Sequence, residues 1–363
     1  MSYERPNIAR MQGYTPGEQL DGDDIIKLNT NENPYAASAA VAKALQETSV
    51  AALRRYPPAS AQAFRAAAAT LHGVNAENLI ATNGGDELLR LVLTTFVDAG
   101  ETIVTTKPGY SLYPVLADIQ DCKLQELPLQ DDWSMPEDFI AKLNQSAAKL
   151  CILVNPHAPT GTLLPVSYLK EVADNFNGIL LIDEAYVDFV DPTLEYNAIP
   201  LATGQPNVLL LRTLSKGYSL AGLRFGYGIG HADLINPMQY KTRDSYNTDL
   251  LAQRLATAAI QSATDAQQTW EKVREQREQL STELSNLGFT ITPSQTNFLL
   301  CQVPTDQDAK QIYLALKERK ILVRYFDQDR LRDKLRISIG TKEENQALLN
   351  ALQESVTSSS GSN

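Results

Sequence analysis

Short, largely apolar runs separated by segments of helical periodicity constrain the fold more than any other feature of this sequence. The runs are Leu79–Thr82, Thr102–Thr105, Leu150–Val154, Ile179–Ile182 and Val208–Leu211. Between the first two, apolar residues from Leu88 to Phe96 recur at helical spacing. Strands that are apolar on both faces are typical of a parallel sheet covered by helices on each side. We therefore predict an α/β fold with a mostly parallel central sheet.

A second, smaller α+β domain is expected after Gly230. Residues 248–287 predict a long helix with one apolar stripe. Shorter strands then alternate with helices, and the strands are expected at Phe289–Thr292, Phe298–Val303, Ile321–Tyr325 and Leu335–Ile339. We divide the chain into an N-terminal arm (1–34), a large domain (35–262), a small domain (263–356) and a disordered polar tail (357–363). We expect the arm to be irregular and to pack with the small domain.

Charge and cysteine use exclude several classes of protein. The chain has 32 basic and 43 acidic residues, a net charge of −11, which argues against binding nucleic acid or anionic membranes. An anionic substrate would need locally placed arginines. Three scattered cysteines form no disulfide framework, and three histidines lack metal-ligand spacing, so we expect no structural metal. Without an apolar signal or membrane segment, the cytoplasm is the expected compartment.

The segment Thr213-Leu214-Ser215-Lys216 directly follows the last apolar run. A lysine at the end of a buried strand is partly desolvated, which lowers its pKa and makes its amine nucleophilic. The hydroxyls of Thr213 and Ser215, with the guanidinium of Arg224, are suited to a phosphate. A lone lysine would more simply be a surface residue, so the interpretation depends on the surrounding pattern.

Three further segments place polar groups after apolar runs. Asp183 and Tyr186 follow one run, at the edge of a parallel sheet where ligands bind, although Asp183 could equally cap a helix. The loop from Asn155 to Gly161 follows another and is fixed by two prolines. In Asn83–Glu87, two glycines precede a helix and could let backbone N–H groups approach an anion. No dinucleotide-binding glycine fingerprint stands at the first strand, which argues against a nicotinamide oxidoreductase.

Together, the motifs N-G-G-D-E, N-P-x-x-P-T-G, D-E-A-Y and T-L-S-K-x-x-x-L-A-G-L-R resemble the fold type I aminotransferases that use pyridoxal 5'-phosphate. More specifically, the arm segment 27–34, the R-Y-P segment at 55–57 and the segments 321–326 and 335–341 resemble the histidinol-phosphate aminotransferases. The resemblance covers nearly the whole chain. It implies transfer of an amino group between L-histidinol phosphate and 2-oxoglutarate or glutamate in histidine biosynthesis.

The resemblance also assigns roles to the cofactor site. Lys216 would carry the cofactor covalently and move the substrate proton, and Asp183 would keep the pyridine nitrogen protonated. Tyr186 and Asn155 would hydrogen-bond the ring hydroxyl, and Tyr110 would stack on the ring. The residues assigned to the cofactor phosphate are Gly85, Asp86, Thr213, Ser215 and Arg224, with Tyr56 reaching across from the other subunit of a homodimer. The N-terminal arm would also contact that partner.

On the substrate side, Arg336 would bind the acid group, while Arg324 and Tyr14 would add donors for the phosphate; Asn33 is expected among the substrate contacts. Arg324 could instead be in a surface ion pair. The sequence departs from the family pattern at residues 35–38 and at His157 and Ala158, where asparagines are common. We expect His157 to face solvent.

Other functions stay open at this point. An aromatic amino acid aminotransferase and a pyridoxal-phosphate-dependent decarboxylase of a phosphorylated amino acid would share the lysine and the aspartate. The aromatic enzyme would not need Arg324, and the decarboxylase would need no glutamate. A non-catalytic sensor of the same fold would carry a DNA-binding module ahead of it, and only 34 residues precede the large domain.

Overall fold

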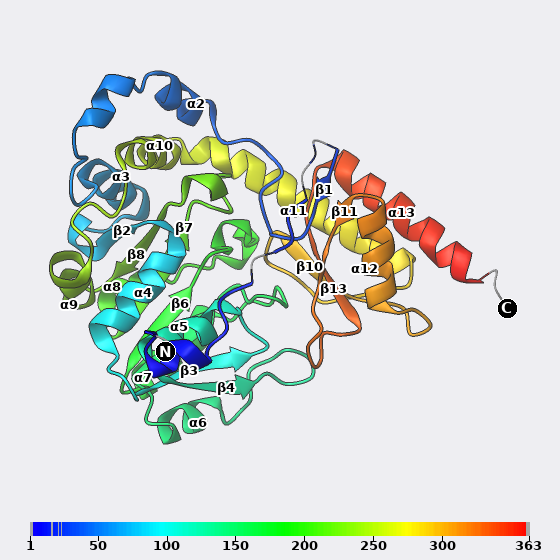
Figure 1. Ribbon diagram of the computed structural model, residues 1–363, viewed down its shortest axis with the longest axis horizontal. Coiled ribbons are helices and arrows are strands. Elements are labelled where there is room, and N and C mark those ends of the chain that lie inside the picture. The colour runs from blue at the N-terminus through cyan, green and yellow to red at the C-terminus, as the bar shows by residue number, and fades with distance from the viewer. Residues whose placement is uncertain (1–2, 16, 21, 23, 361–363) are drawn as a thin grey trace.

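A seven-stranded sheet forms the centre of the large domain in the computed structural model, which describes residues 3–15, 17–20, 22 and 24–360, without the side chains of 355–360 (Figure 1). The strand order is β2-β8-β7-β6-β5-β3-β4. β8 alone runs opposite to the other six strands. The strands are β2 (Leu79–Thr82), β3 (Thr102–Lys107), β4 (Lys123–Pro128), β5 (Leu150–Val154), β6 (Ile179–Asp183), β7 (Val208–Thr213) and β8 (Gly226–Gly230). The mostly parallel α/β fold is therefore confirmed.

Both faces of this sheet are buried, because the side chains of each strand alternate between two hydrophobic cores. In β6, Leu180 and Ile182 belong to one core, while Ile179 and Leu181 belong to the other. The first core is covered by α2 (Ala39–Gln46), α3 (Gln62–His72), α6 (Phe139–Gln145), α7 (Val166–Asn175), α8 (Ile199–Gly204) and α10 (Leu250–Gln261). The second is covered by α4 (Gly84–Phe96), α5 (Leu112–Gln120) and α9 (Ala232–Pro237).

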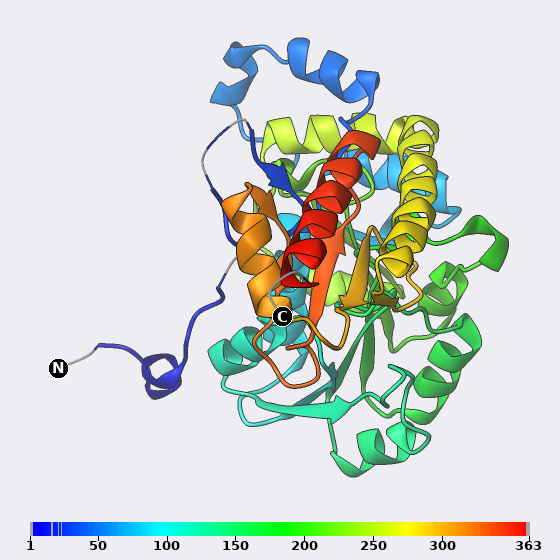
Figure 2. The ribbon, with the colours of Figure 1, turned by 90° about the vertical axis from the view of Figure 1, so that its right-hand side faces the viewer.

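The small domain has a core of its own. Its antiparallel sheet has the order β12-β13-β10-β9, built from β9 (Thr290–Ile291), β10 (Phe298–Gln302), β12 (Arg324–Tyr325) and β13 (Lys334–Ser338). The helices α12 (Ala309–Glu318) and α13 (Lys342–Ser360) lie side by side against it (Figure 2). The tail expected from residue 357 thus falls partly on α13, and residues 361–363 lie outside the described part of the chain.

The N-terminal arm runs from the large domain to the small one. Its helix α1 (Pro6–Arg10) lies against α5, where Asn7 donates to the carbonyl of Asp118 at 2.9 Å. Its strand β1 (Ile26–Lys27) pairs in parallel with β11 (Ile321–Leu322) of the small domain. Because the arm bridges the two domains, its residues 29–31 are brought beside the ends of the central strands.

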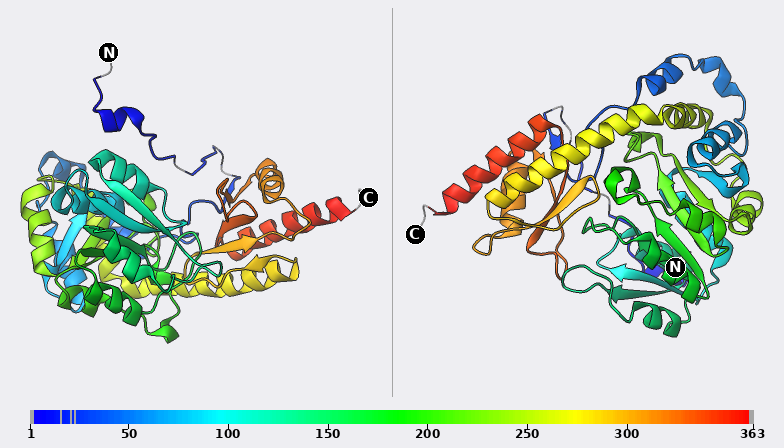
Figure 3. Two further views of the ribbon diagram at one scale, coloured as in Figure 1. Left: turned by 90° about the horizontal axis from the view of Figure 1, so that it is seen from below. Right: turned by 180° about the vertical axis from the view of Figure 1, so that it is seen from behind.

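The long helix expected over residues 248–287 is two helices. α10 ends at Gln261 and α11 (Ala263–Asn286) begins after Ser262, whose hydroxyl donates back to the carbonyl of Ala258 at 2.8 Å. This side-chain bond competes with the helical backbone and marks the break. α11 then runs from the large domain to the small domain, beside α13 (Figure 3). Among the described residues, no helix combines the length and apolarity needed to cross a membrane.

Candidate active site

A cavity of about 280 Å³ lies at the carboxyl ends of β5, β6 and β7, between the large and small domains. This is the edge at which open parallel sheets bind ligands. Of the residues proposed from sequence, those that line the cavity are Tyr14, Gly85, Asp86, Tyr110, Asp183, Tyr186, Thr213, Ser215, Lys216, Arg224, Arg324 and Arg336. The structure thus gathers both the expected cofactor groups and the expected substrate arginines into one space.

Lys216 follows β7 in a tight turn. Its Nζ donates to the carbonyl oxygen of Thr30 in the arm at 2.8 Å. Burial lowers the pKa of Lys216 to about 8, and the Arg336 guanidinium adds to this effect. The turn is held from behind by Trp270, whose Nε1 donates to the carbonyl of Gly217 at 2.6 Å. Part of this amine population is therefore neutral near physiological pH, far more than for an ordinary lysine, and can act as a nucleophile or base.

Asp183 is the buried carboxylate at the end of β6. Its Oδ2 accepts a hydrogen bond from the Tyr113 hydroxyl at 2.8 Å, and its Oδ1 accepts one from the Ala185 N–H at 3.1 Å. Burial raises the pKa of Asp183 to about 6, and the two hydrogen bonds oppose that rise. Nearby, the Tyr186 hydroxyl accepts from the Asn31 side chain at 3.0 Å. An ionised Asp183 in this setting is suited to a protonated ring nitrogen.

A compact anion-binding corner lies at the start of α4. The hydroxyls of Thr213 and Ser215 are 2.9 Å apart, and Arg224 approaches both Ser215 and Asp86, each at 3.5 Å. Gly84 allows this approach, because a Cβ there would lie 2.7 Å from the Arg224 guanidinium. The N-terminus of α4 adds its dipole. Hydroxyls, a guanidinium and a helix N-terminus together are suited to a phosphate.

The small domain contributes two arginines to the opposite side of the cavity. Arg324 on β12 stands directly opposite Arg336 on β13. The Arg336 Nη2 donates to the carbonyl of Asn29 at 3.0 Å, while its Nε is buried with no partner among the described residues. Tyr14 also lines this cavity, and its ring packs edge-to-face with that of Tyr110, with the ring centroids 6.1 Å apart. Two guanidiniums facing one space provide the donors that an acidic group of the substrate requires.

Three residues proposed from sequence do not line the cavity. The Asn155 side chain is used within its own loop, donating to the Leu164 carbonyl at 3.1 Å and to the Tyr196 hydroxyl at 2.9 Å. The Asn33 amide faces the carbonyl of Gly217 at 3.2 Å, behind the lysine turn. Tyr56 is 81% exposed.

The expectation that His157 faces solvent is wrong. His157 is buried, with its Nδ1 2.7 Å from the hydroxyl of Thr160 and its Nε2 3.3 Å from that of Thr106. The imidazole thus ties the proline-rich loop to β3. Burial lowers the pKa of His157 to about 4, so the ring is neutral at physiological pH. In the same loop, Ala158 rather than Asn155 lines the cavity.

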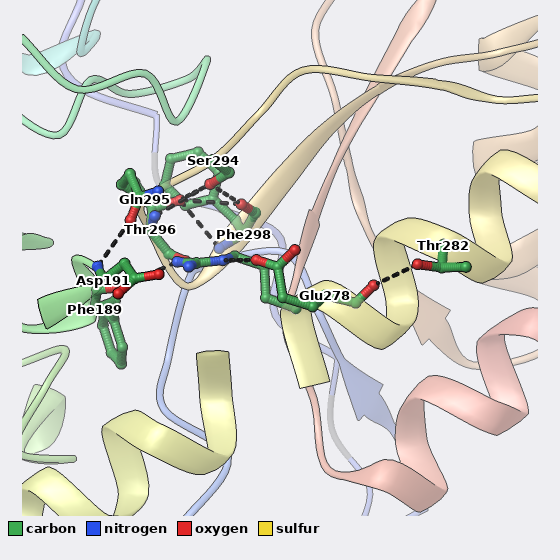
Figure 4. A network of polar contacts seen from close by, with 9 residues as sticks. Phe189, Asp191, Glu278, Thr282, Ser294, Gln295, Thr296 and Phe298 are labelled. Carbon is green, nitrogen blue, oxygen red and sulfur yellow. Dashed lines mark hydrogen bonds and ion pairs between the residues drawn. The ribbon is translucent and has the colours of Figure 1, made fainter. Parts of the chain in front are cut away.

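Sequence reasoning missed the segment 294–298, which connects the domains behind the site (Figure 4). The Gln295 N–H donates to the carbonyl of Gly161 at 2.8 Å, and the Gln295 side chain accepts from the Asp191 N–H at 2.9 Å. From α11, the buried Arg277 donates to the carbonyls of Phe189 and Thr296 at 3.1 and 3.0 Å. The polar residues directly before the buried strand β10 are the sequence feature that could have indicated this connection.

The comparisons with known proteins agree with this geometry. Residues 23–352 match the family model described as aminotransferase class I and II. A histidinol-phosphate aminotransferase 1 of Nostoc sp. is 41% identical over 97% of this chain and 98% of that protein. A histidinol-phosphate aminotransferase of Syntrophotalea carbinolica is also 41% identical, over 98% and 99%. The crystal structure of histidinol-phosphate aminotransferase from Sinorhizobium meliloti in complex with pyridoxal-5'-phosphate has the same fold, with a TM-score of 0.89 at 24% identity over 99% of this chain and 98% of that one. The chain therefore belongs to the class I and II aminotransferase family, among its histidinol-phosphate aminotransferases.

Proposed function

We propose that this enzyme uses pyridoxal 5'-phosphate to transfer an amino group between L-histidinol phosphate and 2-oxoglutarate, with glutamate as the other amine. The observation that carries the proposal is one cavity with the Lys216 amine and the buried Asp183 carboxylate on one side and the Arg324–Arg336 pair on the other. The first two groups serve the cofactor, and the arginines serve the acid groups of the substrates. The 41% identity to proteins of that name supports the substrate.

The residues present fit the cofactor. Asp183 would hold the ring nitrogen, and the corner made by Thr213, Ser215 and Arg224 would hold the phosphate. Pyridoxal phosphate supplies, when bound, an electron sink that lets the substrate's α-proton leave. Tyr110, which lines the cavity beside Asp86, would cover one face of the ring.

Lys216 would bind the cofactor and then move the proton. Its lowered pKa, about 8, keeps the amine partly neutral at the pH of the cell, which a base requires. When the amine is freed, the carbonyl of Thr30 is at hand to hold it within the cavity, 2.8 Å away. The arm therefore contributes to keeping the base in place while the amine is free.

The two arginines account for the use of two different substrates. Histidinol phosphate carries a phosphate ester where an amino acid carries its α-carboxylate. The paired N–H donors of one guanidinium group match a carboxylate, and a second guanidinium group adds donors for a dianion. We infer that Arg336 binds the acid group of either substrate and that Arg324 adds the contacts that phosphate needs.

We also propose a homodimer that works in the cytoplasm. The support for the dimer is an exposed apolar patch on η1 (Val50–Arg54) and its neighbours, in which Val50 is 83% and Tyr56 81% exposed. Tyr56 stacks on Tyr246 with ring centroids 4.4 Å apart. Patches of this kind mark protein interfaces, and Tyr56 would reach the cofactor phosphate of the other subunit. The free, buried thiols of Cys151 and Cys301 suit a reducing compartment.

A half-reaction tests the proposed substrate. The visible spectrum of the purified enzyme is followed after adding histidinol phosphate, and separately phenylalanine, with no keto acid present. We expect fast loss of the lysine-bound cofactor band with histidinol phosphate and slow loss with phenylalanine. The reverse order would assign the enzyme to aromatic amino acids, and release of carbon dioxide would assign it to decarboxylation. Light scattering tests the dimer, and a fully active monomer would refute it.

A further inference from the structure

The placement of Arg324 and Arg336 is unfavourable without a ligand. They are directly opposed in the antiparallel pair β12–β13, so both side chains leave the sheet on the same face. Like charges at directly opposed positions repel each other. Something in the protein must therefore hold the two guanidiniums beside one another until a dianion neutralises them.

The ring of Phe326 contacts both cations. The Arg324 guanidinium lies 5.2 Å from the ring centroid, and the Arg336 guanidinium lies 5.4 Å from it. Both distances fall within the range of cation–π attraction. One aromatic ring thus offsets part of the repulsion between the two arginines.

The two arginines depend on this ring to different degrees. Arg336 is also held by the carbonyl of Asn29 at 3.0 Å and by the ring of Phe298 at 5.2 Å. The Arg324 guanidinium makes no hydrogen bond or ion pair with any residue that the structure describes, and Phe326 is its aromatic contact. Loss of the ring should therefore release Arg324 and leave Arg336 in place.

Phe326 is itself fixed by a small cluster that joins the domains. It packs against Leu129, Trp133, Leu300 and Leu331. Arg330, in the same loop, closes the cluster by donating to the Leu129 carbonyl at 2.7 Å and by lying 4.4 Å above the Trp133 ring. The ring is thus held by residues of both domains, and it lines the cavity.

We propose that Phe326 is a specificity-determining positioning residue, whose ring holds Arg324 beside Arg336 and so favours an amine with a phosphate dianion over one with carboxylates only. This inference rests on the proposed function of the site. Glutamate needs Arg336, which keeps its other contacts when the Phe326 ring is lost. The phosphate ester needs the guanidinium groups of both arginines. The ring does not touch the reacting atoms, and it acts through the arginines.

Phe326→Leu tests the proposal, because leucine keeps most of the apolar contact but has no π face. Half-reactions of the loaded enzyme are measured with histidinol phosphate and with glutamate. We expect the half-saturating concentration of histidinol phosphate to rise about tenfold, the scale of two lost cation–π contacts. That of glutamate should change less than about twofold, and the limiting rate should be nearly unchanged for both. Inhibition of the glutamate half-reaction by inorganic phosphate should weaken in parallel.

Two further variants separate positioning from packing. Phe326→Tyr keeps the ring and should restore wild-type discrimination. Tyr325→Leu removes the aromatic ring of the neighbouring residue, which is stacked on Tyr313 and away from the two arginines. It should therefore leave the ratio between substrates unchanged. Thermal unfolding of each variant checks the fold, and Phe326→Met replaces Phe326→Leu if the latter does not fold.

The outcomes are distinct. An equal loss for both substrates in Phe326→Leu, or a Phe326→Tyr variant no better than Phe326→Leu, would overturn the role of the ring. A wild-type enzyme that does not convert histidinol phosphate would instead refute the proposed function, whatever the variants do.

Discussion

The hydrogen bond from Tyr113 to Asp183 is expected to set the pH range in which the protein binds its cofactor. Tyr113→Phe removes this one buried donor, 2.8 Å from the carboxylate, and keeps the ring. The bond favours the charged carboxylate, so its loss raises the pKa of Asp183. A hydrogen bond to a charged group contributes about 1.5–3 kcal/mol, which corresponds to about one to two pKa units. The pKa of Asp183, about 6 in the wild type, should therefore rise to about 7–8 in the variant.

The cofactor-free protein is titrated with pyridoxal phosphate between about pH 5 and pH 9, and binding is followed by visible absorbance. At each pH, the dissociation constant of Tyr113→Phe is divided by that of the wild type. This ratio cancels the titrations of the cofactor itself and of Lys216, which both proteins share. Because binding needs the ionised carboxylate, the variant should bind about tenfold to a hundredfold more weakly at pH 5 and about equally at pH 9.

A matched control is available in Tyr168, whose buried hydroxyl has no hydrogen-bond partner among the described residues. Tyr168→Phe should leave the dissociation constant unchanged at every pH. If the ratio of dissociation constants for Tyr113→Phe were the same from acid to alkaline pH, the lost cofactor affinity would come from altered packing. Such a result would show that the Tyr113 hydroxyl does not set the pKa of Asp183.

Three other substitutions probe the frame of the site. Lys216→Ala should abolish both the visible band of the lysine-bound cofactor and turnover, and a full-strength band on titration would remove this lysine from its role. Glu184→Gln breaks the buried 2.8 Å pair with Arg212. The free energy of unfolding, measured with denaturant, should fall by about 3 kcal/mol. This is the low end for a broken buried pair, because Asp188 remains near the Arg212 guanidinium. A decrease below about 1 kcal/mol would show that the pair is not effectively buried. Gly217→Ala would place a Cβ 2.1 Å from the Asp188 carboxylate, so the lysine turn must shift. Cofactor affinity should fall while circular dichroism shows a folded protein, and an unchanged titration would contradict the clash.

The central strands could be predicted because burial on both faces leaves a direct trace in the sequence. β2 and β5 begin and end at the predicted residues. The edge strand β4 was missed because Lys123, Gln125 and Glu126 interrupt its apolar pattern and Leu127 is its only buried residue. Its pairing with β3 provides the stability that its own composition does not suggest.

In the site, the groups at strand ends could be predicted, while those defined by tertiary contact could not. Lys216 and Asp183 follow apolar strands, and such positions converge at one edge of a parallel sheet. Nothing in the linear pattern distinguishes Asn155, turned toward Tyr196, from Ala158, which lines the cavity. Arg324 and Arg336 face each other because of the register between β12 and β13. The 11 residues between them in the sequence do not determine that register.

The positions of the two tryptophans give the protein a built-in optical readout. Trp270 donates to the carbonyl beside Lys216, and Trp133 lies beneath Arg330 in the cluster that holds the cavity wall. The chain has no other tryptophan. A variant that keeps only Trp270 would therefore report, through its fluorescence, on events at the lysine turn. One that keeps only Trp133 would report on the approach of the small-domain loop. Cofactor loading and loop movement could thus be timed separately in one unlabelled protein.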